Sequence, residues 1–232
     1  MGILPRPVSR AFAIGIAQLV YLLHFRLRQV GMRNLAMAFP ERNETDRRRI
    51  LRGVFTSLGR QLAELCQFPR YTAANVDEVV VYDGLEHFEK AYARGKGVLF
   101  LTAHFGGWEL SAFAHSLHGY WLHVVMRPMD NVYLDQLLQS YRTMHGNKVV
   151  PKDDFVRGLL GAMKCGETVG ILMDTNMTPP QGVFVDFFGI PACTATTGYA
   201  RSAARETAET FALSSDVCRP RPRGSAQSRT DD

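Results

Sequence analysis

Short apolar runs alternate with helix-like stretches along the chain from about Val76. This alternation is the strongest constraint that the sequence places on the fold. Six runs have the length and the β-branched or aromatic character of strands: VDEVVVYDG, KGVLFLTAH, WLHVVMRP, NKVVPK, TVGILMD and GVFVDFFG. Most are separated by helical stretches: LEHFEKAYARG, ELSAFAHSLHG, NVYLDQLLQSYRTMHG and DFVRGLLGAMKCGE. Strands and helices in alternation predict an α/β fold with a mostly parallel central sheet flanked by helices.

Composition limits the class of protein and its partners. The chain has 232 residues, of which 46% are hydrophobic and 21% charged, so it can form one large domain with a buried core. Its net charge of +5 favours negatively charged partners such as phosphates, phospholipid headgroups or an acidic carrier protein. That excess is too modest to indicate nucleic acid. The four cysteines lie far apart without a C-x-x-C pair, which indicates reduced thiols and neither a disulfide frame nor a zinc site.

An apolar run near the N-terminus, AFAIGIAQLVYLLHF (Ala11 to Phe25), is flanked by arginines on both sides. It is shorter than the roughly 20 residues that cross a bilayer comfortably. Three interpretations stay open: a short spanning anchor, a helix lying on the membrane surface, or a buried core helix. We assign residues 1–30 to an N-terminal hydrophobic anchor, since flanking arginines suit either membrane geometry.

A long amphipathic helix is expected after the anchor. Pro40 ends one helical stretch, and Thr45 is the predicted N-cap of the next. Apolar residues then recur at three- and four-residue spacing, which predicts a helix with one buried face. These residues are Leu51, Val54, Phe55, Leu58, Leu62 and Leu65. The main domain is expected to cover residues 31–206.

The stretch LTAHFGGWEL (Leu101 to Leu110) carries the candidate chemistry. His104 follows an apolar strand, at the edge of a parallel sheet where ligands bind. Gly106 and Gly107 allow the backbone to turn or to approach a ligand closely. Glu109 then falls in the first turn of the next helix, from which a carboxylate can orient the imidazole for proton abstraction. The spacing of histidine and glutamate is by itself a weak signal.

Several ordered motifs make the signal specific. LTAHFGGWEL resembles the first motif, H-x-x-x-x-D/E, of the bacterial lipid A biosynthesis (late) acyltransferases within the glycerolipid and lysophospholipid acyltransferase superfamily. Further stretches resemble this family in the same order: RNLAMAFPE (Arg33 to Glu41), VVMRPMDN (Val124 to Asn131), YRTMHGNKVVPK (Tyr141 to Lys152) and GILMDTNMTPPQGVFVDFFGIPACTATTGYA (Gly170 to Ala200). The resemblance covers roughly residues 10 to 205.

The resemblance implies a role for particular residues. His104 would be the general base and Glu109 its orienting carboxylate, while Arg142 would support the site and Asp174 would be the acidic residue of the third block. Arg127 is the expected ligand of an acceptor phosphate. The remaining expected substrate-binding residues are Gly106, Gly107, Phe188 and Gly189.

The implied reaction is attack of a glycolipid hydroxyl, for example on a lipid A precursor, on the thioester of an acyl carrier protein or coenzyme A. The family resemblance implies no metal, no other cofactor and no nucleic acid, and it implies a place at the cytoplasmic face of the inner membrane. A lysophospholipid or mannoside-type acyltransferase and an inactive membrane-bound remnant stay open as alternatives. A hydrolase is disfavoured because no G-x-S-x-G motif is present.

The end of the chain departs from the family pattern. Residues 207–232 lose the resemblance and the hydrophobic periodicity, and SDVCRPRPRGSAQSRTDD (Ser215 to Asp232) has the composition of a disordered tail. We interpret this segment as the product of a truncation or a frameshift. On that hypothesis the C-terminal part of the fold is incomplete.

Overall fold

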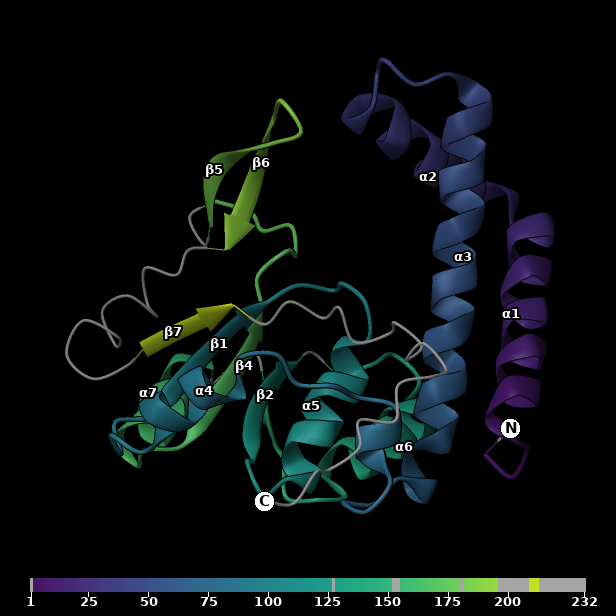
Figure 1. Cartoon of the computed structure of the whole chain (residues 1–232). Helices are drawn as coiled ribbons and strands as arrows, with labels where there is room; N and C mark the ends of the chain where they lie inside the picture. The colour runs from purple at the N-terminus through teal and green to yellow at the C-terminus, as the bar shows by residue number, and fades with distance from the viewer. Residues whose placement is uncertain (1, 127, 152–154, 180–181, 196–208, 213–232) are drawn as a thin grey trace, which may run out of the picture.

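A computed structural model describes residues 2–126, 128–151, 155–179, 182–195 and 209–212 (Figure 1). Its helices are α1 (Arg6–Leu23), α2 (Phe25–Ala38), α3 (Glu44–Gln67), α4 (Leu85–Tyr92), α5 (Trp108–Leu117), α6 (Val132–Thr143) and α7 (Phe155–Lys164), with 3-10 turns η1 (Phe68–Arg70) and η2 (Val76–Glu78). Its strands are β1 (Val98–Thr102), β2 (Leu122–Met126), β3 (Lys148–Pro151), β4 (Thr168–Leu172), β5 (Gly182–Phe187), β6 (Ile190–Ala195) and β7 (Glu209–Ala212).

The main sheet is parallel, with strand order β3-β2-β4-β1-β7. The predicted α/β class is therefore confirmed, and so are the predicted helices between the strands. Val98 and Val169 in the central strands are fully buried, as expected where helices cover both faces of a parallel sheet. The register pairs Val98 with Thr168 and Thr102 with Leu172, so β1 and β4 end side by side.

Successive residues of β1 anchor different helix layers. Leu99 packs with Leu159 and Met163 of α7, whereas Phe100 packs with Phe88 of α4. Such alternation follows from the two-residue period of a strand. The sheet is consequently covered by helices on both faces, as Figure 1 shows. Helix α5 adds a further layer, in which Leu110, Phe113 and Ala114 pack against Phe68, Tyr71, Val76 and Val80.

Helices α1, α2 and α3 form a helical arm beside the sheet, with α1 lying along α3 (Figure 1). Asn43, rather than the predicted Thr45, caps α3, since the Asn43 side chain accepts a hydrogen bond from the Asp46 amide at 2.8 Å. The helices approach closely at Gly59, where a Cβ atom would lie 2.7 Å from the Ile14 Cα. The absence of a side chain at Gly59 therefore allows α1 and α3 to pack closely.

A buried carboxylate also joins α1 to α3. Glu64 accepts hydrogen bonds from Arg6 and Arg10, and the Tyr71 hydroxyl donates to it at 2.6 Å. Burial, together with the hydrogen bond to Glu64, raises the pKa of Tyr71, so this hydroxyl stays protonated as a donor. The two arginines on the N-terminal side of the apolar run, Arg6 and Arg10, therefore bind Glu64 inside the protein.

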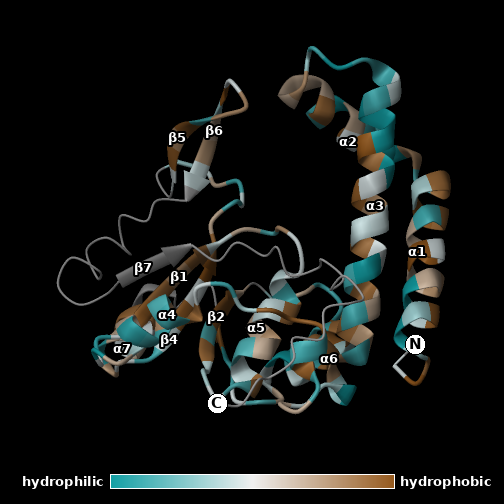
Figure 2. Cartoon of the chain, viewed as in Figure 1, coloured by the Kyte–Doolittle hydropathy of each residue, from teal (hydrophilic) through white to brown (hydrophobic). Residues whose placement is uncertain are grey.

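The apolar run predicted as an anchor lies mainly on α1 and leaves many of its side chains exposed (Figure 2). No single helix in the described part of the chain is long and apolar enough to cross a bilayer. Taken together, α1 and α2 do meet the length and composition requirement, but they are bent by 87°. The assignment of residues 1–30 to a membrane anchor stays a prediction.

Three predicted segments differ from the structure. VDEVVVYDG forms η2 and loop instead of a strand, because Val76 and Val80 are buried against α5 without joining the sheet. GVFVDFFG does form strand β5, but this strand pairs with β6 in a separate antiparallel hairpin. Within the predicted tail, Glu209–Ala212 forms β7, whose backbone pairs with the edge of β1. Residues 213–232 lie outside the described residues.

Candidate functional site

The candidate site is built where β1 and β4 end. Because Thr102 is in register with Leu172, the second residue beyond each strand, His104 and Asp174, falls at the same position along the sheet. The Met173 amide donates a hydrogen bond to the Thr102 carbonyl at 2.8 Å, directly before this point. Two segments that are 70 residues apart in sequence are thereby fixed side by side.

Asp174 contacts His104 twice. Its Oδ1 lies 2.8 Å from the imidazole Nδ1, and its Oδ2 accepts a hydrogen bond from the His104 backbone amide at 2.8 Å. The Trp108 ring packs edge-on against the imidazole with a centroid separation of 5.1 Å. These contacts fix the ring while its side chain stays 42% exposed, so an incoming ligand can reach it.

The ionisation of Asp174 reflects these contacts. Partial burial alone raises the pKa of Asp174, but hydrogen bonds from the His104 ring and backbone, with the attraction of the His104 charge, outweigh it. The net effect holds the pKa of Asp174 below its usual value. Asp174 is consequently a carboxylate at neutral pH and can accept a hydrogen bond from the Nδ1–H group of His104.

Glu109 pairs with Arg142, not with His104. The Arg142 Nε donates to Glu109 Oε2 at 2.9 Å, and the Arg142 Nη2 donates to Glu109 Oε1. The pair links the first turn of α5 to the last turn of α6, and both side chains are mostly buried. Arg142 also approaches the sulfur of Met126 at the end of β2. This bidentate pair ties α5, α6 and β2 together.

The expected contact between Glu109 and the imidazole is therefore replaced by the contact from Asp174. Gly106, with a φ of 58°, turns the backbone into α5, and Glu109 in the first turn of that helix bonds to α6. The resemblance and the short spacing assigned the orienting role to Glu109, and the resemblance named Asp174 only as an acidic residue of the third block. The pairing of Asp174 with His104 depends on its position two residues after the strand that pairs with β1, which requires the sheet order.

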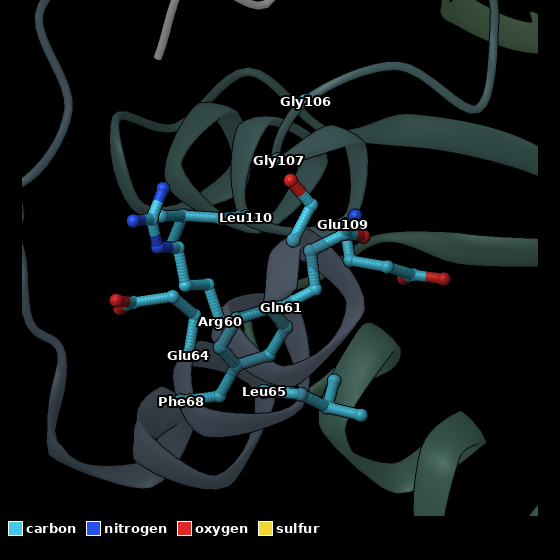
Figure 3. Close-up of a pocket in the computed structure, with 10 residues that line it drawn as sticks. Arg60, Gln61, Glu64, Leu65, Phe68, Gly106, Gly107, Glu109 and Leu110 are labelled. Atoms are coloured by element: carbon cyan, nitrogen blue, oxygen red, sulfur yellow. The ribbon is translucent and has the colours of Figure 1, made fainter. Parts of the chain in front are cut away.

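A mostly apolar pocket adjoins this turn, between α3 and the start of α5 (Figure 3). Gly106, Gly107, Glu109 and Leu110 form one wall. The opposite wall comes from α3 and η1, through Ser57, Arg60, Gln61, Glu64, Leu65 and Phe68. The site therefore combines half-exposed charged groups with an adjacent apolar recess, an arrangement common for sites that bind amphipathic ligands.

The other predicted substrate-binding residues are scattered. Arg127 lies outside the described residues. Phe188 and Gly189 form the turn of the β5–β6 hairpin, where the Phe188 ring contacts Phe39 and Phe187. In the described part of the chain, no group of three or more His, Cys, Asp or Glu side chains is arranged to hold a metal ion.

Comparison with known proteins identifies the family of the chain. The family described as bacterial lipid A biosynthesis acyltransferase matches residues 1–213. The lipid A biosynthesis lauroyltransferase of Escherichia coli (strain K12) is 31% identical over 198 residues, covering 84% of this chain and 63% of the relative.

Two further relatives give a similar picture. A lipid A biosynthesis acyltransferase of Haemophilus influenzae (strain ATCC 51907 / DSM 11121 / KW20 / Rd) is 28% identical, covering 84% of this chain and 62% of its own length. The lipid A biosynthesis palmitoleoyltransferase of Escherichia coli (strain K12) is 26% identical, covering 84% and 63%. The chain thus spans a little under two thirds of the length of these relatives. The extent of the family match shows that the chain belongs to the bacterial lipid A biosynthesis acyltransferase family.

Proposed function

We propose that this protein transfers a fatty acyl chain from an acyl thioester to a hydroxyl of a lipid A precursor or a related glycolipid. The observation that carries this proposal is the His104–Asp174 pair at the mouth of the sheet, with Asp174 2.8 Å from Nδ1. The names of the relatives, which include a lauroyltransferase and a palmitoleoyltransferase of lipid A biosynthesis, support the choice of acyl transfer.

His104 acts as the general base in this proposal. The Asp174 carboxylate accepts a hydrogen bond from Nδ1–H, which keeps the proton on Nδ1 and leaves the lone pair on Nε2 available to a substrate hydroxyl. When Nε2 takes a proton, the adjacent carboxylate stabilises the resulting imidazolium. Asp174 thus takes the orienting role that the sequence pattern assigned to Glu109.

The reaction proceeds by direct transfer. The acceptor oxygen attacks the thioester carbonyl carbon as its proton passes to Nε2 of His104. The C–O bond of the new ester forms, the C–S bond breaks, and the departing thiolate takes the proton back from the imidazolium. Amides in the first turn of α5 lack partners within the helix, and they are positioned by the Gly106–Gly107 turn to stabilise the oxyanion.

The Glu109–Arg142 pair has a positioning role in this scheme. It fixes α5 against α6 and so holds the turn that carries His104. The pocket between α3 and α5 lies next to Glu109 and is suited to the acyl chain of the donor, because its lining is mostly apolar. Arg127 stays the predicted contact for an acceptor phosphate.

The donor and the cellular location follow from charge and apolar surface. A net charge of +5 favours an acidic acyl carrier protein as donor, with coenzyme A thioesters as the alternative. The exposed apolar face of α1 and α2 favours association with the cytoplasmic face of the inner membrane, where a glycolipid acceptor resides.

The direct test is acyl transfer from acyl carrier protein and from acyl coenzyme A to lipid A precursors, with lysophospholipid as the competing acceptor. His104→Ala should lower the rate about 10²- to 10⁴-fold, the usual contribution of a general base. His87→Ala, at an exposed histidine of α4, is the matched control and should keep the rate. Equal activity of His104→Ala and the unchanged protein would refute the mechanism. Lipid binding without transfer from any donor would support the inactive remnant.

A further inference from the structure

The β5–β6 hairpin exposes apolar side chains on both of its faces. Neighbouring residues of a strand point to opposite faces, yet Val183, Phe184 and Val185 are all exposed, Phe184 by 64%. A two-stranded hairpin is at best marginally stable in water, and exposed apolar clusters of this kind mark interaction sites. The hairpin therefore needs a surface to contact.

The turn of this hairpin places a bulky aromatic residue, Phe188, at a positive φ angle. Phe187 pairs with Ile190, so Phe188 and Gly189 form a two-residue turn with φ values of 57° and 75°. Asparagine or aspartate before glycine is the usual choice for such a turn, since a side chain at positive φ is strained by about 1–2 kcal/mol. The Asp186 carboxylate already stabilises the turn by accepting the Gly189 amide at 3.0 Å. The Phe188 ring thus has a purpose other than forming the turn.

The hairpin tip adjoins the helical arm. The Phe188 ring lies edge-on to Phe39, directly after α2, with a centroid separation of 5.2 Å. Figure 1 shows the hairpin and α2 at the same end of the molecule, and Figure 2 shows apolar residues on both. Helix α2 itself exposes Phe25, Leu27, Val30 and Met37. Hairpin and α2 therefore present neighbouring apolar surfaces.

Arginines predominate beside these surfaces. Residues 1–40 contain arginines at positions 6, 10, 26, 28 and 33 and no aspartate or glutamate; near the hairpin tip, Asp186 accepts the Gly189 amide and Glu41 pairs with Arg42. Arg6 and Arg10 bind Glu64, but Arg26 and Arg33 on α2 are exposed. Arg42 lies over the Phe39 ring at 5.6 Å, close to the hairpin tip. An apolar surface bordered by arginines complements a bilayer with anionic headgroups.

We infer that the β5–β6 hairpin is a second membrane-contacting element, which inserts its aromatic tip into the interface of an anionic bilayer beside α2. Aromatic side chains are well suited to the depth of the headgroups. This inference goes beyond acyl transfer, and it rests on the proposed association of α1 and α2 with the membrane. A membrane attached through α2 and the hairpin would hold the molecule at two points and fix its orientation.

Co-sedimentation of the full chain with phosphatidylethanolamine vesicles containing phosphatidylglycerol tests the inference. The double variant Phe184→Ser/Val185→Ser should weaken partitioning about tenfold, because it removes two apolar side chains from the interface. Val81→Ser is the matched control, since Val81 is 71% exposed but lies outside the hairpin and the arm. Partitioning of the control should equal that of the unchanged protein.

The variant Phe188→Asn distinguishes a membrane role of the Phe188 ring from a role in the turn. Asparagine before glycine favours this turn but removes the ring contact with Phe39, so a purely structural role changes the stability of the protein and leaves partitioning unchanged. A membrane role predicts weaker partitioning despite the better turn. Unchanged partitioning of both hairpin variants would overturn the inference. Loss of self-association in light scattering, with partitioning unchanged, would instead assign the hairpin to a contact between two copies of the chain. Acyl transfer to detergent-dispersed acceptor is measured separately, so failure of either proposal is recognisable.

Discussion

The sheet edge and the helical arm place charge and apolar surface in opposite ways. At the sheet edge, the strands are buried and the hydrogen-bonded pair His104–Asp174 is partly exposed. In the arm, the Glu64 side chain is only 6% exposed and binds Arg6, whereas apolar residues of α1 face outward. The comparison teaches that polar pairs in one molecule serve different ends: the exposed pair can meet a polar reactant, and the buried one holds helices together.

This contrast predicts separable effects of mutation. Changes at the sheet edge should lower acyl transfer and leave the free energy of unfolding nearly unchanged. Changes where α1 packs on α3, away from the pocket residues of α3, should lower the free energy of unfolding and leave the activity of each folded molecule intact. The predictions below test this separation from the largest expected effect to the smallest.

The largest effect on the transfer rate is expected from substitution of Asp174, compared with substitution of Glu109. Asp174→Asn should lower the transfer rate about 10²- to 10³-fold, because the amide cannot accept from both the Nδ1 proton and the His104 amide. Glu109→Gln should lower the transfer rate about tenfold. It weakens the Glu109–Arg142 pair, which positions α5 but does not contact the imidazole. Rates at saturating donor, with unfolding curves for both variants, provide the measurement. A greater loss in Glu109→Gln than in Asp174→Asn would return the orienting role to Glu109.

A pH effect is expected from His115, a buried histidine of helix α5. Burial, followed by the nearby charge of His118, lowers the pKa of His115 from 6.5 to about 4. The ring lies among aromatic residues, 4.6 Å from Phe88 between centroids, and its Nδ1 is 3.4 Å from the Tyr82 hydroxyl. His115 is therefore neutral in the folded protein at pH values where it is already protonated in the unfolded chain.

The sign of the effect follows from this difference. Between pH 6.5 and about 4 the unfolded state binds more protons, so stability falls as the pH falls, by about 3 kcal/mol in all. Denaturant unfolding at several pH values should show this loss in the unchanged protein and its absence in His115→Phe. His87→Gln, at an exposed histidine, should keep the full loss. The same pH dependence in His115→Phe would show that other groups cause it.

The smallest effect concerns the packing of the arm. Gly59→Ala should lower the free energy of unfolding by about 1–3 kcal/mol, because its Cβ meets backbone atoms of α1 that cannot move aside cheaply. Gly53→Ala in the same helix is the control. Its Cβ meets no atom within 4 Å, so it should stabilise the helix by about 0.5–1 kcal/mol.

Thermal unfolding of both variants, beside acyl transfer corrected for the folded fraction, checks this prediction. Equal stability of the two variants would show that α1 does not pack on α3 as described. Reduced transfer per folded molecule in Gly59→Ala would instead break the separation between arm and sheet edge.

The strand order explains which parts of the site could be predicted from sequence. Apolar runs separated by helices predicted the parallel sheet, and the position of His104 at a strand end followed from the same pattern. The partner of His104 did not follow, because 70 residues separate it from Asp174 and only the register of β1 with β4 brings them together. Local spacing favoured Glu109, whose partner Arg142 is also distant in sequence.

Three details depend on contacts that local sequence does not specify. VDEVVVYDG has the apolar residues of a strand. Val76 and Val80 are buried by packing against α5, so the segment does not pair with the sheet. GVFVDFFG has the correct local structure, yet no sequence pattern states which strand it pairs with. The N-cap of α3 was displaced by two residues, because asparagine and threonine both accept hydrogen bonds from a helix start.

The hydrogen bond from the Met173 amide to the Thr102 carbonyl has a consequence for inhibition. It joins the two strand ends directly before His104 and Asp174, so the backbone of the described residues already brings the two side chains together. If the proposed function holds, an inhibitor that binds the imidazole meets a preorganised target and spends little affinity on ordering it. Rigid, compact molecules that present a hydroxyl mimic to His104 should therefore gain more affinity here than flexible analogues of the acyl donor.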